Sequence, residues 1–234
     1  MANQIMLSIV VPCYNESQVI LNTIKTIKKS LKYNFIKNYE IIIVDDKSID
    51  NTKYNILDIK KKNPKSTKLI FNKSNLGLGG SLIKGFKISK GEYIMWLPGD
   101  NAHSIKDIIK LIRLVNTRKF DIIIPLNNNS NRSNSREIFS KIYVLLINII
   151  FQKNIKYYNG AIIYKKKILK KAIKLSLSKS HFFLAETLIR ALKYVNKYYY
   201  VTCSVKKQNT SNAIRLSNLI KIVIDIVKFR IRIL

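Results

Sequence analysis

The sequence predicts an α/β fold, in which a mostly parallel central sheet carries helices on both faces and an amphipathic helix follows at the carboxyl end. Two observations predict this architecture. Short apolar runs alternate along the chain with stretches in which apolar residues recur every three or four positions. The first run, at 7–11, is apolar at successive residues rather than at every second one, as in parallel strands that are covered on both faces.

Each expected strand is a short apolar run with a polar residue or a breaker at its end. The first, 7–11, ends at Pro12, and the second, 40–44, ends in two aspartates. The run at 93–97 lies between Gly91 and a Pro-Gly pair. The expected strands are 7–11, 40–44, 67–71, 93–97, 120–125 and 198–205, with a further short apolar segment at 161–164.

The expected helices fill the intervals between these runs. The first carries Val19, Ile24 and Leu31 at helical spacing, and the second ends where Asn63-Pro64 interrupts the chain. A glycine-rich loop at 75–80 opens the third. Further helices are expected at about 104–117, 136–151, 165–174 and 181–194, with a polar loop at 127–134.

The last segment, 212–234, predicts a separate amphipathic helix that follows a domain at 1–211. Its polar residues recur at alternating steps of three and four and form one narrow stripe: Asn218, Lys221, Asp225, Lys228 and Arg232. Charges at every turn argue against a membrane span. Three interpretations stay open: the helix lies on a membrane surface, packs on the domain or pairs with another copy.

The chain carries an extreme positive charge. Its 43 Lys and Arg against 13 Asp and Glu give a net charge of +30. Nucleic-acid binding, attraction to an anionic membrane surface and a coding bias toward Lys, Asn and Ile each produce such a balance. We expect no nucleic-acid partner, because the basic residues are spread along the chain without the interleaved aromatic residues of an RNA-binding sheet. Two cysteines, Cys13 and Cys203, indicate a reducing compartment.

The run at 93–97 delivers a carboxylate to the end of its strand. Pro98 and Gly99 end the strand, and Asp100 follows directly. Open α/β sheets bind ligands at the carboxyl ends of their strands, so Asp100 is a candidate metal or nucleotide contact. The alternative interpretation is that Asp100 caps the helix that begins near Ser104.

Four segments at expected strand ends together resemble one family of enzymes. They are 12–16, 45–52, 75–85 and 98–100. This ordered set resembles the family 2 glycosyltransferases, inverting enzymes of the GT-A fold, and in particular the dolichyl- or polyprenyl-phosphate mannose and glucose synthases. The resemblance covers roughly residues 7–211. It also argues against a dinucleotide cradle at the glycine-rich loop, because no acidic residue follows at the ribose position.

The resemblance implies a pocket for a nucleotide-sugar donor, linked to UDP or GDP. Tyr14 offers an aromatic face on which a base can stack, and Pro12 and Glu16 belong to the same pocket. Asp46 is expected to accept a hydrogen bond from the base. The remaining donor-binding residues implied by the resemblance are Val44, Pro98, Gly99, Asp100 and Lys206, the last in place of an arginine that closes over the diphosphate.

The resemblance also implies a divalent cation, Mg²⁺ or Mn²⁺, bound by Asp100. Such a cation bridges the diphosphate oxygens and stabilises the leaving nucleoside diphosphate. The family motif at this place is Asp-x-Asp, whereas this chain reads Pro98-Gly99-Asp100 and lacks the first carboxylate. The second Asp is the one expected to stay on the metal.

Two further residues match catalytic positions beyond the donor half. Arg136 matches an arginine that faces phosphates, which suits the bidentate geometry of a guanidinium; a solvated helix arginine is the alternative. Glu186 matches a glutamate in the late helix, which acts as a base or holds Arg190 one turn away. A phosphate-binding arginine expected near Asn127 is absent from the sequence.

These features predict transfer of a sugar to a polyprenyl phosphate at a membrane. A phosphate acceptor is already ionised, so it needs no general base. We expect a cytoplasmic protein, peripheral on the inner face of an anionic membrane and without a transmembrane span. Two alternatives stay open: transfer to a saccharide or surface glycan, and a degenerate member that binds nucleotide without catalysis.

Overall fold

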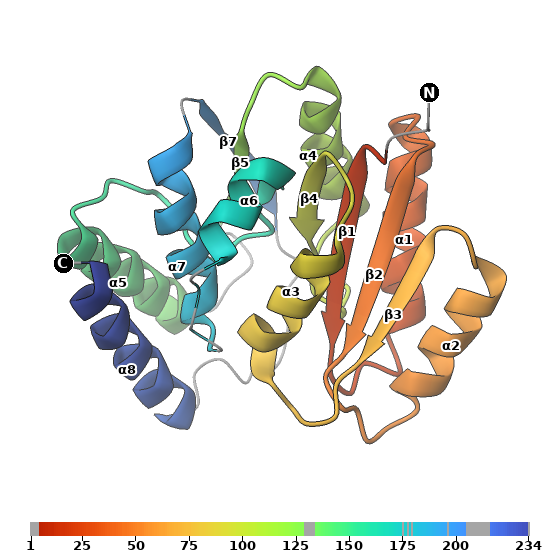
Figure 1. Cartoon of the computed structure of the whole chain (residues 1–234), viewed down its shortest axis with the longest axis horizontal. Coiled ribbons are helices and arrows are strands. Elements are labelled where there is room, and N and C mark those ends of the chain that lie inside the picture. Colours follow the sequence, from red (N-terminus) through yellow and green to blue (C-terminus); the bar gives the residue numbers. More distant parts are fainter. Residues whose placement is uncertain are drawn as a thin grey trace.

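A computed structural model describes residues 5–128, 134–174, 176, 178, 180–195, 197–204 and 216–233. Within this part of the chain, seven strands form one sheet (Figure 1). The strands are β1 (Leu7–Cys13), β2 (Tyr39–Asp45), β3 (Thr67–Phe71), β4 (Tyr93–Trp96), β5 (Ile122–Asn128), β6 (Ile163–Lys165) and β7 (Tyr198–Ser204). Their order across the sheet is β3-β2-β1-β4-β6-β5-β7.

Helices connect these strands and cover the sheet. They are α1 (Ile20–Tyr33), α2 (Thr52–Lys62), α3 (Gly77–Ile88), α4 (Ile105–Thr117), α5 (Asn134–Phe151), α6 (Lys166–Ile173), α7 (Phe182–Ala191) and α8 (Leu216–Ile233), with a short 3₁₀ helix, η1 (Leu192–Tyr194). None of the described helices is both long and apolar enough to cross a bilayer.

The side chains of β1 divide between two hydrophobic layers. Ile9 and Val11 pack with apolar residues of α1, α2 and α4 on one face of the sheet. Val10 points to the other face and joins residues of α3, α6 and α7. Because both faces are covered, β1 carries successive apolar residues, with Ser8 as the exception. The prediction of a mostly parallel sheet between two helical layers is confirmed.

One glycine brings α3 unusually close to the sheet. A Cβ at Gly85 would lie 2.3 Å from Val10 Cγ1, so no larger residue fits between helix and strand. The close approach places the start of α3, and the loop before it, directly beside the carboxyl ends of β1 and β2 (Figure 1).

The sequence did not reveal the direction of β6. This strand runs antiparallel to both of its neighbours, β4 and β5, and separates them. It is only three residues long, and an apolar run of that length carries no mark of direction. Trp96 at the end of β4 fixes the segment before β6, because its indole Nε1–H donates to the Gly160 carbonyl at 3.0 Å.

The predicted bounds of the loop at 127–134 are wrong at both ends. β5 continues to Asn128, where Asn127 and Asn128 pair with Cys203 and Ser204 of β7. Backbone pairing with a neighbouring strand extends β5 beyond its apolar run, because the ladder needs main-chain groups and not apolar side chains. At the other end, α5 already begins at Asn134.

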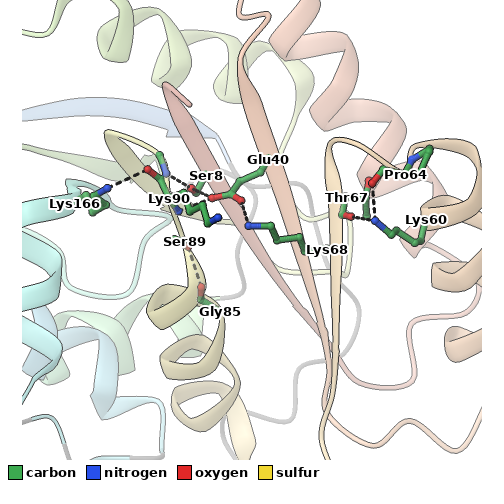
Figure 2. Close-up of polar contacts among 11 residues, drawn as sticks. Ser8, Glu40, Lys60, Pro64, Thr67, Lys68, Gly85, Ser89, Lys90 and Lys166 are labelled. Carbon is green, nitrogen blue, oxygen red and sulfur yellow. Dashed lines mark hydrogen bonds and ion pairs between the residues drawn. The ribbon is translucent and has the colours of Figure 1, made fainter. Parts of the chain in front are cut away.

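The buried carboxylate of Glu40 joins three strands at their amino-terminal ends. Glu40 of β2 accepts hydrogen bonds from Ser8 Oγ at 2.5 Å and from the Lys90 N–H at 2.6 Å (Figure 2). Its second oxygen lies 2.6 Å from Lys68 Nζ of β3. Burial alone would raise the pKa of Glu40, but these hydrogen bonds and the Lys68 charge lower it below its usual value.

The carboxyl-terminal helix packs on the domain. Phe229 of α8 is buried. The centroid of its ring lies 5.1 Å from that of Phe151 in α5 and 5.8 Å from that of Phe182 in α7. Of the three interpretations of this helix, packing on the domain is therefore confirmed for one of its sides. The expected boundary between 211 and 212 lies outside the described residues and stays a prediction.

Candidate functional site

The turn after β4 is held against the end of β1 and against α1 by hydrogen bonds to the main chain of Gly99. The Gly99 N–H donates to the Pro12 carbonyl at 3.1 Å, and the Gly99 carbonyl accepts from Thr23 Oγ1 at 2.7 Å. A Cβ at position 99 would lie 2.9 Å from Cys13 Cβ, so this approach requires glycine. Asp100 therefore emerges at a fixed place, beside the carboxyl ends of β1 and β4.

The loop after β1 is joined to the loop after β2 by reciprocal hydrogen bonds. Asn15 adopts the left-handed region, with φ 56°. Its N–H donates to Ser48 Oγ at 3.0 Å, and its Oδ1 accepts from the Ile49 N–H at 2.9 Å. The next N–H, that of Glu16, donates to Thr52 Oγ1 at 2.7 Å. Both loops thus form one unit at the edge of the sheet where ligands bind in open α/β folds.

Asp50 adds a charged contact to this unit. Its Oδ2 accepts from the Ser17 N–H at 3.1 Å, and its Oδ1 accepts from the Thr52 N–H at 2.9 Å. Burial alone would raise the pKa of Asp50, but the hydrogen bonds from Thr52 and Ser17 lower it to about 2. Asp50 is therefore ionised at neutral pH.

Asp46 holds the start of α3 in place. Its Oδ1 accepts from Asn72 Nδ2 at 2.7 Å and from the Leu76 N–H at 2.8 Å, and its Oδ2 accepts from the Gly77 N–H at 2.8 Å. A carboxylate has about four acceptor positions, so roughly one remains for a ligand. The hydrogen bond between Asp46 and a nucleotide base stays a prediction.

The other predicted donor contacts differ in exposure. Tyr14 is 44% exposed, so its ring is accessible for stacking. Pro12 is buried within β1. Val44 is fully buried in the core, so any contact between Val44 and a nucleotide must come from its main chain. All three roles stay predictions.

Asp100 does not cap α4. The N-cap of that helix is Ser104, whose Oγ accepts from the Asp107 N–H at 3.1 Å. Asp100 Oδ1 instead accepts from the Ala102 N–H at 2.9 Å, within the turn itself. The capping interpretation of Asp100 is therefore wrong, because Ser104 already supplies the side-chain oxygen that the first turn requires.

Glu16 and Asp100 lie close enough to interact electrostatically. Burial raises the pKa of Glu16, and the charges of Asp100 and Asp50 raise it further, to about 7. A positive charge between Glu16 and Asp100 would reverse this effect. The two carboxylates therefore contribute to one negatively charged region, and cation binding there stays a prediction.

The chemistry of this pair fits Mg²⁺ or Mn²⁺ only with help from a ligand. Carboxylate oxygens are the ligands that these hard cations prefer, and Mg²⁺ commonly combines one or two carboxylates with phosphate oxygens. In the described part of the chain, no group of three or more His, Cys, Asp or Glu side chains could hold a metal ion. Metal binding by Asp100 stays a prediction.

Glu186 lies in a second cluster, between α7 and α8. It is 1% exposed, its Oε1 accepts from Arg190 Nε at 3.0 Å, and its Oε2 accepts from the Ser178 N–H at 3.1 Å. Ser178 Oγ in turn donates to Asp225 Oδ2 of α8 at 2.6 Å. The predicted pair with Arg190 is confirmed, whereas a direct role of Glu186 in catalysis stays a prediction.

A small cavity of about 150 Å³ adjoins this cluster, lined by Ser178, Glu186, Asp225, Lys228, Phe229 and Arg232.

Two predicted residues cannot be placed. Arg136 belongs to α5, but its side chain is outside the part of the structure that is described. Lys206 lies in the segment 205–215, also outside the described residues. Their predicted contacts with phosphates stay predictions.

Sequence reasoning missed the residues that support the site. Thr23, Asn72 and Ser178 each make side-chain hydrogen bonds to a distant segment. Their partners are 76, 26 and 47 residues away. The sequence carries one weak signal, since Asn72 directly follows an expected strand at the same edge as Asp46.

The family follows from a match over most of the chain. Residues 8–174 match the family described as Glycosyl transferase family 2. The chain belongs to this family. Its strand-end loops are thus those of a glycosyltransferase with the GT-A fold, as the resemblance implied.

Relatives of this glycosyltransferase include two dolichyl-phosphate beta-glucosyltransferases. The Saccharomyces cerevisiae protein is 36% identical over 113 residues, which is 47% of this chain and 34% of that protein. The Dictyostelium discoideum protein is 34% identical over 110 residues, 45% of this chain and 34% of that protein. The chain thus matches about a third of the length of these two relatives.

Solved structures share the fold of this glycosyltransferase. Glucosyl-3-phosphoglycerate synthase from Mycobacterium tuberculosis, in complex with Mn²⁺, UDP and glucosyl-3-phosphoglycerate, superimposes with a TM-score of 0.72 at 12% identity and covers 96% of this chain and 79% of its own. Staphylococcus aureus TarS in complex with UDP-GlcNAc gives a TM-score of 0.59 at 16% identity, with 88% and 60% covered.

Proposed function

We propose that this glycosyltransferase transfers a sugar from a UDP- or GDP-linked donor to a polyprenyl phosphate, with inversion at the anomeric carbon. The observation that carries the proposal is the 36% identity over 113 residues to a dolichyl-phosphate beta-glucosyltransferase. Dolichyl phosphate is a polyprenyl phosphate, so the name of that relative gives the chemical class of the acceptor.

The donor occupies the edge formed by the loops after β1, β2 and β4. The exposed ring of Tyr14 stacks on the base, and Asp46 accepts a hydrogen bond from it. Asp100 would hold a divalent cation beside the diphosphate, with Glu16 nearby. Such a cation would stabilise the negative charge that develops on the leaving nucleoside diphosphate. Support for this placement comes from the contacts that fix Asp100 and Glu16 on neighbouring loops.

The acceptor phosphate needs no base from the protein. One of its ionised oxygens attacks the anomeric carbon, and the bond from that carbon to the diphosphate breaks with its electron pair on the leaving group. Glu186 is consistent with this scheme, because its two oxygens are engaged by Arg190 and by the Ser178 N–H. Arg136 and Lys206 are the cations proposed to contact phosphates.

The acceptor class places the reaction at a membrane. A polyprenyl chain is anchored in lipid, so the proposed site works at the cytoplasmic face of a membrane, with the protein held peripherally. The net charge of +30 supports attraction to anionic lipid.

A transfer assay tests the proposal. Purified protein is given radiolabelled UDP- or GDP-sugars with Mg²⁺ or Mn²⁺, and with either a polyprenyl phosphate in detergent or a soluble oligosaccharide. We expect a lipid-linked sugar from one donor, and no product from the Asp100→Asn variant. Asp58→Asn is the matched control, because Asp58 is an exposed surface carboxylate that pairs with Lys62. Transfer to the oligosaccharide but not to the lipid would overturn the acceptor.

A second candidate is a non-catalytic member that binds nucleotide only. The specific observation in its favour is Pro98, which stands where the family has the first Asp of Asp-x-Asp. Calorimetry with UDP and GDP, with and without Mn²⁺, separates the two. Metal-dependent binding together with donor turnover supports the enzyme, whereas metal-independent binding without turnover supports the second candidate.

A further inference from the structure

Helices α5 and α8 together present a broad apolar surface. They lie side by side at one end of the molecule (Figure 1), where the rings of Phe151 and Phe229 join them. Large apolar side chains that are between 45% and 68% exposed follow one face of each helix. We call this set the apolar face: Ile138, Phe139, Ile142, Leu145, Leu146 and Ile149 of α5, with Val223, Ile224, Val227 and Ile231 of α8.

The rotation of α8 about its axis is fixed by polar contacts on its inner side. Asp225 Oδ2 accepts from Ser178 Oγ and from Ser180 Oγ, each at 2.6 Å. Phe229, one turn further on, is 4% exposed. The single carboxylate of α8 is thereby turned toward the protein, and Val227 and Ile231 are turned outward. Because Ile222 and Ile226 pack on the domain beside Phe229, α8 carries apolar residues on its inner side as well as on its outer side.

The inner side of α5 is equally well occupied. Ile147 is fully buried, and Asn148 is bound at both ends of its amide: Nδ2 donates to the Ile155 carbonyl at 3.0 Å, and Oδ1 accepts from the Ile155 N–H at 3.1 Å. Leu145 and Ile149 therefore cannot turn inward without breaking these contacts. The apolar face is thus built into the packing of both helices.

Exposed apolar side chains gathered on two neighbouring helices indicate a candidate binding surface. Charge decides between the candidate occupants. The described part of α8 holds four basic residues, and its one acid, Asp225, is engaged on the inner side; the basic residues are Lys221, Lys228, Arg230 and Arg232. A second copy of the chain would bring another net charge of +30 against this one. An anionic lipid surface offers apolar depth and opposite charge together.

We propose that the apolar face of α5 and α8 inserts into the interface of an anionic membrane, with the basic residues of α8 at the level of the lipid headgroups. The proposal rests on the proposed function in one respect: a lipid-linked acceptor gives a reason for the protein to lie on lipid. It adds α5 as a second inserted helix, and it fixes which side of α8 faces the bilayer.

Insertion of this pair connects the membrane to the cluster around Glu186. Ser178 contacts Asp225 of α8 through its hydroxyl group and Glu186 of α7 through its N–H. The lipid-bound helix is therefore two hydrogen bonds away from the buried carboxylate. Helix α8 also contacts α7 directly, because the Phe229 ring packs against Phe182 and lies 4.7 Å from the Arg190 guanidinium.

Vesicle co-sedimentation tests the proposal. Full-length protein is mixed with vesicles of phosphatidylcholine alone, or of phosphatidylcholine with phosphatidylglycerol. Two variants replace exposed apolar residues: Leu145→Gln/Ile149→Gln on α5 and Val227→Gln/Ile231→Gln on α8. We expect strong binding of the wild type to the anionic vesicles only. Each variant should bind at least about tenfold more weakly, because burial of two large apolar side chains contributes more than one factor of ten in affinity.

The matched control is Tyr33→Gln/Leu57→Gln. These two side chains, on α1 and α2, are also exposed, at 58% and 43%, and their helices lie at the other end of the sheet (Figure 1). The control should bind anionic vesicles like the wild type. Equal binding by all variants and the wild type, or equal losses in the control, would overturn the proposal. So would a wild-type dimer in vesicle-free solution that the α5 and α8 variants dissociate, since the face would then bind a second copy.

A fluorescent label provides a readout that does not depend on mutating the face to polar residues. Both native cysteines, Cys13 and Cys203, are buried, so a single introduced cysteine can be labelled selectively. An environment-sensitive dye at Leu145→Cys should shift to the blue when anionic vesicles are added, and the same dye at Leu57→Cys should not. A shift at Leu57→Cys without one at Leu145→Cys would contradict the assigned face.

The outcomes for the membrane face and for the proposed function are separable. Nucleotide-sugar binding, measured by calorimetry without vesicles, should be unchanged in the α5 and α8 variants. Donor binding without any vesicle binding would overturn the membrane face alone. Vesicle binding through this face without donor binding would overturn the proposed function alone.

Discussion

Asp100 owes its position to its neighbours as well as to its own hydrogen bond from the Ala102 N–H. Gly99 is fixed to Pro12 and Thr23 by hydrogen bonds, and it has no room for a side chain. The carboxylate therefore meets a ligand without first being ordered, which lowers the entropic cost of binding.

The first prediction concerns the charge of Asp100. The isosteric change Asp100→Asn should lower donor turnover by at least about a hundredfold, because partners that only support a metal ligand already contribute roughly 10–100-fold. Initial rates over a range of Mn²⁺ concentrations measure it. A variant that keeps wild-type turnover and the same Mn²⁺ dependence would remove Asp100 from the site.

The second prediction concerns Glu16 and pH. The pKa of Glu16 in the folded protein is about 7, above its ordinary value of 4.5. The folded state therefore holds this proton more tightly than the unfolded state, and stability is lost as the pH rises from 4.5 through 7. Glu16→Gln removes the charge while keeping the shape of the side chain.

We expect Glu16→Gln to melt above the wild type at pH 8. With solvent screening of a half-buried group, a gain of about 1 kcal/mol corresponds to roughly 2–4 °C in a domain of this size. The difference should disappear below pH 4.5, where the wild-type side chain is protonated in both states. Melting curves between pH 4 and pH 8 without ligand measure it; a variant that melts below the wild type at pH 8 would show that the Glu16 charge is stabilised.

The sequence shows which candidate site residues follow strands, but it does not show what holds them in place; their donor-binding roles stay predictions. Asp100 and Tyr14 are visible because they follow apolar runs, and strand ends gather at one edge of a parallel sheet. The role of Asp46 in holding Leu76 and Gly77 is not visible, because it depends on how closely α3 approaches β2. That distance depends on how the helix packs on the sheet, and no local sequence pattern predicts it.

At the scale of elements, Glu40 is the clearest source of stability. It joins β2 to β1 through Ser8, to β3 through Lys68 and to the segment before β4 through the Lys90 N–H (Figure 2). The change Glu40→Ala leaves a buried N–H and a lysine without their acceptor. We expect a loss of about 2–4 kcal/mol, or roughly 5–15 °C in the melting temperature. Thermal unfolding measured by circular dichroism checks it.

Asp58→Ala is the control for Glu40. Asp58 pairs with Lys62 on an exposed turn of α2, so its removal should change stability by no more than about 0.5 kcal/mol. Because the pKa of Glu40 is lowered on folding, its contribution is present above pH 4.5 and is lost as the pH falls through the folded value. Equal melting temperatures for the two variants would contradict the role of Glu40.

The orientation of α8 shows where helical periodicity stops being informative. The sequence identifies a narrow polar stripe and a wide apolar surface, and most surface helices turn the apolar side inward. Here Ser178 and Ser180 supply partners for Asp225, and Phe229 packs on the domain together with the partly buried Ile222 and Ile226. The orientation of α8 thus depends in part on Ser178 and Ser180, which lie far from α8 in sequence. No pattern within the helix could have revealed them.

For the whole molecule, the net charge of +30 predicts a two-part response to salt. Binding to anionic vesicles should weaken as salt rises, because the screening length falls from about 10 Å at 0.1 M to about 3 Å at 1 M. A residual, salt-resistant part should remain for the wild type and vanish for Leu145→Gln/Ile149→Gln. Co-sedimentation over a salt series measures both parts; salt-independent binding would show that charge plays no role.

The place of β6 has a consequence for synthesis of the chain. β4 completes its pairing with β1 early, but its other edge waits for β6, which leaves the ribosome only after α4, β5 and α5. Through that interval the nascent chain exposes an unpaired strand edge with the apolar residues Ile94 and Met95 beside it. Open edges of this kind recruit chaperones or aggregate. A truncated chain that stops before residue 163 therefore leaves the sheet unfinished at its centre, and not at its rim.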